Sequence, residues 1–131
     1  MKLQELIERY CFHDSYPKSI RFDSIKKSLK ITIHFCNWMQ SYYQSNMEEL
    51  ILIDLIFNNV QLFECDNHEK YDDCYTFFNA KLISNPLYGT GIEFVLFHDD
   101  SGEMNVIRIF AQNVELVELG PDTDDDMSED L

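Results

Sequence analysis

The chain of 131 residues is 45% hydrophobic and 14% aromatic, and its 24 Asp and Glu residues against 10 Lys and Arg give a formal net charge of −14. This length and apolar content predict one packed domain and exclude a largely disordered protein. Because such a charge repels nucleic acid and anionic lipid, we expect no nucleic-acid partner and no membrane partner. No apolar run approaches the length of a membrane span, and the first residues lack the apolar region of a signal peptide, so we expect a cytoplasmic protein with reduced cysteines.

The charge is unevenly distributed along the chain. Residues 1–35 have a net charge of +3, residues 36–121 have −11, and residues 122–131 contain six acids and no base. We therefore predict a single β-rich globular domain over residues 1–121 and a disordered acidic tail over residues 122–131. An acidic surface attracts basic proteins, but acidity that only keeps a small protein soluble remains an equally weighted alternative.

The first elements expected are a short helix and a hairpin. Leu3, Leu6, Ile7 and Tyr10 follow a helical spacing and predict an amphipathic helix over residues 2–10, which Pro17 prevents from continuing. Residues 19–22 and 29–35 alternate apolar and polar side chains, and the polar segment 23–28 between them predicts a hairpin of two half-buried strands.

The middle of the chain contains its most apolar run, residues 49–57, in which Asp54 is the only internal charge. Its composition predicts a central strand with both faces largely covered, and Asn58 and Asn59 are expected to end it. Residues 60–63 are then a further short strand or a packed turn. The connection over residues 37–46 carries Trp38, Tyr42 and Tyr43, which either cover one end of the core or form an exposed aromatic cluster.

The remaining strands are expected over residues 75–83, 92–98, 104–110 and 114–119. Turn-forming residues separate them, with residues 99–102 (Asp-Asp-Ser-Gly) as the strongest hairpin signal. The total is about seven strands and one short N-terminal helix. This pattern predicts a mainly β fold, either an antiparallel β-sandwich or a curved, barrel-like sheet, with strand order and oligomeric state left open.

Two acidic segments are the candidate partner-binding sites, because charged loops on a rigid β scaffold raise the rate of encounter with an oppositely charged protein. Their acidic residues are Asp66, Glu69, Asp72 and Asp73 in the first segment, and Asp99, Asp100 and Glu103 in the second. The sequence thus favours a non-enzymatic domain that binds a basic protein partner. We assign no catalytic residue, no cofactor and no metal site.

The sequence also leaves other functions open, but it favours them less than protein binding. The segment over residues 66–73 offers oxygen ligands for calcium but lacks the glycine of a calcium-binding loop. Cys11, His13, His34 and Cys36 form two short Cys/His pairs that leave a zinc site, or a metal-dependent enzyme using the two histidines, conceivable. No nucleophile-elbow, phosphate-loop or dinucleotide motif is present. A small structural or regulatory domain is the main alternative to the binding function.

The order of turns and strands also resembles that of a group of small uncharacterised bacterial proteins. The markers are the turn His13-Asp14-Ser15 before the first hairpin, the apolar positions Ile20, Leu29, Ile31 and Ile33, and the corner formed by residues 57–60. Some of those families are immunity proteins of polymorphic toxins. The resemblance covers roughly residues 6–119 and implies a cytoplasmic antitoxin that occludes the active site of a basic toxin, with no active-site residue to carry over.

Overall fold

The computed structural model describes residues 1–65 and 75–122, which form one antiparallel sheet of six strands and one short α-helix. The elements are α1 (Leu3–Arg9), β1 (Tyr16–Asp23), β2 (Ser28–Cys36), a 3-10 turn (Asn37–Met39), β3 (Leu50–Cys65), β4 (Tyr75–Asn85), β5 (Gly89–His98) and β6 (Met104–Pro121). The strand order is β1-β2-β3-β6-β5-β4, and the sheet is not closed into a barrel. The expected mainly β fold with an N-terminal helix is confirmed.

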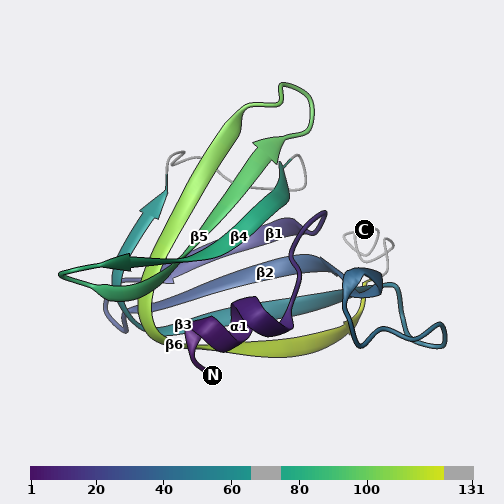
Figure 1. Cartoon of the computed structure of the whole chain (residues 1–131), viewed down its shortest axis with the longest axis horizontal. Helices are drawn as coiled ribbons and strands as arrows, with labels where there is room; N and C mark the ends of the chain where they lie inside the picture. Colours follow the sequence, from purple (N-terminus) through teal and green to yellow (C-terminus); the bar gives the residue numbers. More distant parts are fainter. Residues whose placement is uncertain (66–74, 123–131) are drawn as a thin grey trace, which may run out of the picture.

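β3 and β6 form the long central pair, and both bend strongly along their length (Figure 1). The bend brings the start of β1 back to the edge strand β4. The backbone N–H of Asp14 donates to the carbonyl of Phe77 at 3.0 Å, and the N–H of Phe77 donates to the carbonyl of Ser15 at 2.8 Å. These two bonds hold the open edges of the sheet together at one point without a continuous strand pairing.

The expected end of the third strand at Asn58 and Asn59 is wrong, since β3 continues through both residues to Cys65. Asn59 adopts a left-handed conformation with φ of 53°, which Asn tolerates better than most residues, and the register with β6 shifts between Val60 and Leu62. A bulge of this kind bends a strand without ending it. β6 likewise joins the two strands expected over residues 104–110 and 114–119, so six strands replace about seven.

The inner face of the sheet holds the hydrophobic core. α1 lies inside the curve and contacts β4, β5 and β6, with Leu3 and Leu6 buried against the sheet (Figure 1). The ring of Phe12, in the segment after the helix, lies near those of Phe35, Phe77 and Phe94, with centroids 5.5 to 6.4 Å apart. The expected helix is thus confirmed, with seven residues or about two turns. Within the described residues, no helix is long and apolar enough to cross a membrane.

The outer face of β3 differs from the prediction that both faces of this strand are largely covered. Ile51, Ile53, Leu55 and Phe57 point inward and are buried, whereas Leu50, Leu52, Asp54 and Ile56 alternate with them and are only half-buried. β3 is central in the sheet, as expected, but nothing among the described residues forms a second layer over its outer side.

Candidate protein-binding surface

The tip between β5 and β6 is a tight turn built around His98. The backbone N–H of His98 donates to the carbonyl of Glu103 at 2.9 Å, and that of Gly102 donates to the carbonyl of His98 at 2.7 Å. The His98 Nδ1 atom accepts the N–H groups of Asp100 and Ser101 at 3.3 and 3.2 Å. Gly102 has φ of +73°, a left-handed conformation that glycine adopts with less strain than other residues. The hairpin predicted from residues 99–102 is therefore present, and hydrogen bonds fix the backbone of its tip.

This tip presents three exposed carboxylates, those of Asp99, Asp100 and Glu103. Asp99 accepts a hydrogen bond from the Thr76 hydroxyl at 2.7 Å. Within the described part of the chain, none of the three is in an ion pair, whereas Glu5, Glu64 and Glu93 each have a basic partner. The negative charge of the tip is thus not neutralised by nearby bases of the described chain.

The four other predicted partner-binding residues, Asp66, Glu69, Asp72 and Asp73, lie outside the described residues. The strands on either side of that segment are nevertheless placed. Cys65, the last residue of β3, pairs with Ile107 of β6, and Tyr75, the first residue of β4, pairs with His98 of β5. The chain therefore leaves and re-enters the sheet at the same end as the acidic tip, which we call the acidic end (residues 98–104 with Cys65 and Tyr75).

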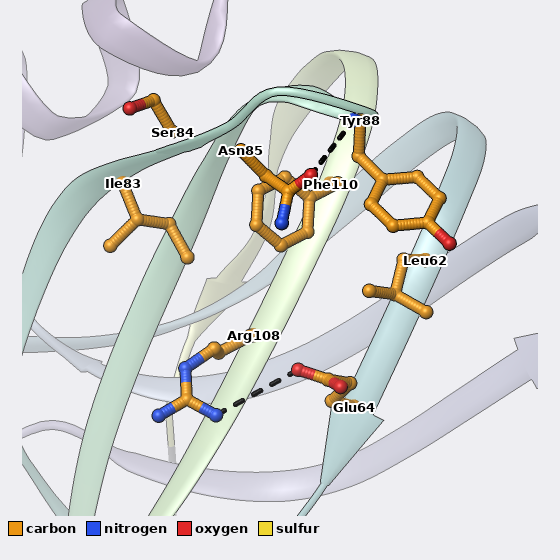
Figure 2. Close-up of a pocket in the computed structure, with 8 residues that line it drawn as sticks. All are labelled: Leu62, Glu64, Ile83, Ser84, Asn85, Tyr88, Arg108 and Phe110. Carbon is orange, nitrogen blue, oxygen red and sulfur yellow. Dashed lines mark hydrogen bonds and ion pairs between the residues drawn. The ribbon is translucent and has the colours of Figure 1, made fainter.

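A separate pocket of about 510 Å³ lies on the outer face, toward the turn between β4 and β5 (Figure 2). Its lining comes from β3, β4, β6 and that turn: Leu62, Glu64, Ile83, Ser84, Asn85, Tyr88, Arg108 and Phe110. The Asn85 side chain accepts the backbone N–H of Tyr88 at 3.2 Å and so fixes the turn beside the pocket. The sequence analysis did not identify this pocket.

Arg108, the one cation among the described residues that line the pocket, is already neutralised. Its guanidinium lies 3.7 Å from Glu64, and its Nε donates to Glu93 at 3.0 Å, while Lys81 lies 3.4 Å from the other oxygen of Glu93. Strand pairing places Glu64 of β3, Arg108 of β6, Glu93 of β5 and Lys81 of β4 opposite one another, so their charges alternate in a row across four strands. This row stabilises the sheet surface and leaves the pocket without a free charge for an anionic ligand.

The apolar part of the pocket depends on Gly91. A Cβ atom at this position would lie 2.6 Å from the ring of Phe110 and 2.8 Å from the carbonyl oxygen of Ile109. The Phe110 ring occupies that space and packs beside Tyr88, with ring centroids 5.8 Å apart. The sequence shows Gly91 only as a turn residue, because its contact with Phe110 arises from the pairing of β5 with β6.

The Cys/His pairs weighed as a zinc site are engaged in separate contacts. His13 is hydrogen-bonded through Nδ1 to the carbonyl of Phe78 at 3.0 Å, and His34 is bonded through Nδ1 to Asp122 at 2.6 Å. The buried Cys36 thiol donates to the carbonyl of Asp14 at 3.3 Å, and Cys11 is exposed. Over residues 1–65 and 75–122, no group of three or more His, Cys, Asp or Glu side chains could hold a metal ion.

The aromatic residues of the connection between β2 and β3 lie at the surface. Trp38 is 46% and Tyr42 39% exposed, and Tyr43 is half-buried. Tyr42 nevertheless packs edge-on against Tyr10 and donates its hydroxyl to Asn37 at 3.1 Å. Burial, with Tyr10 and the carboxylate of Glu118 nearby, raises the pKa of Tyr42 to about 12. Of the two alternatives left open by the sequence, exposure applies to Trp38 and Tyr42.

The acidic end is the surface that the sequence and the geometry identify together, while the pocket is found from the geometry alone. No family model matches the chain, and no curated protein or solved structure was found to match it.

Proposed function

We propose that this protein is a non-enzymatic binding domain that recognises a basic protein through its acidic end. The observation that carries the proposal is the exposed tip with Asp99, Asp100 and Glu103, none of which has an ion-pair partner in the described chain. Charges that are not neutralised within their own molecule act at the longest range on an approaching partner, and they raise its rate of association.

The rigidity of the tip supports the same function. Its backbone is fixed by hydrogen bonds to His98, and one carboxylate is fixed by Thr76, so that little conformational entropy is lost when a partner binds. The chain also enters and leaves the acidic segment 66–74 at this end of the sheet. Two acidic segments that start from one end of a rigid sheet favour a single binding surface.

A narrower form of the proposal is an inhibitor of immunity type, which covers the active site of a basic toxin. It rests on the resemblance of the turn and strand order described above and on the net charge of −14. In this form, binding to the acidic end abolishes the activity of the partner.

The experiment is capture of partners by the tagged full chain from the cells that produce it, followed by elution with increasing salt. We expect one basic protein in stoichiometric amount, released as salt screens the charges. The variant Asp99→Lys/Asp100→Lys is expected to lose it. The matched variant Glu48→Lys/Glu49→Lys, with the same change of charge at exposed positions beside the other end of β3, is expected to retain it.

Either of two results would overturn the proposal. One is the absence of any stoichiometric partner at low salt, and the other is a partner that both charge-reversal variants retain equally. For the narrower form, the captured protein must also lose its toxic activity when it is mixed with this chain.

A further inference from the structure

Three hairpin turns of the described chain share one arrangement of hydrogen bonds. In each, the side chain of the last strand residue accepts the backbone N–H groups two and three positions further on. Asp23 Oδ1 does so after β1, at 3.0 and 3.1 Å, and Asn85 Oδ1 does so after β4, at 2.7 and 3.2 Å. After β5 the acceptor is the Nδ1 atom of His98, at 3.3 and 3.2 Å. Asp and Asn are the usual residues in such turns, so His98 takes the place of an oxygen acceptor.

The arrangement around His98 requires a neutral ring. A backbone N–H group can only donate, so Nδ1 is an unprotonated acceptor and the ring carries its proton on Nε2. A second proton, added at Nδ1, would convert this atom into a donor and remove both hydrogen bonds at once. The amide oxygen of Asn85 undergoes no such change, whereas histidine is the side chain whose charge ordinarily changes between about pH 5 and about pH 8.

Aromatic and acidic groups surround this ring. Among the described residues, the titratable groups around it are the Tyr75 phenol of β4, whose ring packs edge-on with centroids 5.0 Å apart, and the carboxylates of Asp99, Asp100 and Glu103 in the tip. A protonated ring would have these carboxylates as its partners in place of the backbone N–H groups. Its positive charge would also offset part of the negative charge of the tip.

We propose that His98 makes the tip between β5 and β6 sensitive to pH, because the turn is ordered while the ring is neutral and is released when the ring takes up a proton. Release restores conformational freedom to a backbone that His98 otherwise fixes, and the new charge weakens the attraction of a basic protein. Both effects lower the affinity of the acidic end for a basic partner as the pH falls. This consequence for binding rests on the proposed function, whereas the change in the turn does not.

The test is nuclear magnetic resonance relaxation of the isotope-labelled full chain, without any partner, from about pH 8 to about pH 5. The ring signals of His98 report its protonation, and the backbone order parameters of Asp100 and Ser101 report the turn. We expect these order parameters to fall from about 0.85 to below about 0.6 as His98 is protonated. The amides of Leu87 and Tyr88, whose acceptor is the Asn85 side chain, should stay ordered throughout and serve as an internal control.

His98→Asn is the matched variant, because its side-chain oxygen lies the same number of bonds from Cα as Nδ1 does and does not titrate in this range. Its turn should stay ordered at both ends of the pH range, whereas His98→Ala, which has no acceptor, should be disordered at both. The proposal is overturned by a His98 ring that stays neutral down to about pH 5, by a turn that keeps its order when the ring is protonated, or by a loss of order at low pH that His98→Asn also shows. None of these results depends on the capture experiment, so this proposal and the proposed function can fail separately.

Discussion

Cys36 illustrates how single residues at the end of β2 are fixed by polar contacts within the core. Its backbone N–H donates to the Ser15 hydroxyl at 2.9 Å, and its thiol donates to the carbonyl of Asp14 at 3.3 Å. Ser15 is fully buried and Cys36 is 5% exposed. Burial, as the largest cause, raises the pKa of the Cys36 thiol. The thiol therefore remains protonated, and unreactive, at a pH where an exposed cysteine begins to ionise.

We predict that iodoacetamide modifies Cys11 much faster than Cys36, because the thiolate is the reactive form and Cys11 is exposed. The reaction of Cys36 should also require a higher pH than that of a free thiol, since its pKa is raised. Mass spectrometry of peptides from timed reactions gives both rates. Equal rates in the native protein would contradict the burial of Cys36, and urea should abolish the difference.

At the scale of elements, Gln40 connects the segment before β1 to the end of β2. The side chain accepts the backbone N–H of Cys11 at 2.8 Å and donates to the carbonyls of Cys11 and Cys36 at 2.7 and 3.0 Å. It is 5% exposed. One amide thus satisfies three backbone groups of two segments that are not otherwise paired as strands.

Gln40→Ala is expected to lower the free energy of unfolding by about 1–3 kcal/mol, because buried backbone groups lose their partners. Gln44→Ala is the matched control at an exposed position of the same connection and should change stability by less than about 0.5 kcal/mol. Urea unfolding of both variants measures the difference. Equal stabilities would show that water replaces the Gln40 amide at no cost.

The elements that the sequence predicts correctly are those with local signals. The hairpin of β1 and β2 follows from alternation and a polar turn, and the β5–β6 tip follows from residues 99–102. The length of β3 was not predictable in this way, because Asn58 and Asn59 favour a turn and only the pairing with β6 keeps them in a strand. The acidic tip could be predicted because its residues are adjacent in the sequence. The contact of Phe110 with Gly91 could not, because it depends on the register between β5 and β6.

At the scale of the whole molecule, the acidic end and the last described residue lie at opposite ends of the sheet. The acidic end lies where β5 turns into β6, whereas Asp122 follows the end of β6, beside the start of β3. The last described residue, Asp122, is assigned to the acidic tail from the sequence. It is instead held against the sheet by His34 and by its N–H bond to the carbonyl of Leu50 at 3.1 Å.

The most direct test of the binding function is the association rate constant between this chain and the basic protein that it captures, measured by stopped flow at low and high salt. We predict that Asp99→Lys/Asp100→Lys lowers the rate constant by about tenfold or more at low salt, because steering depends on the charge facing the partner. The effect should shrink at high salt, and Glu48→Lys/Glu49→Lys should change the rate much less. Equal rates for the wild type and both variants would contradict recognition through the acidic end.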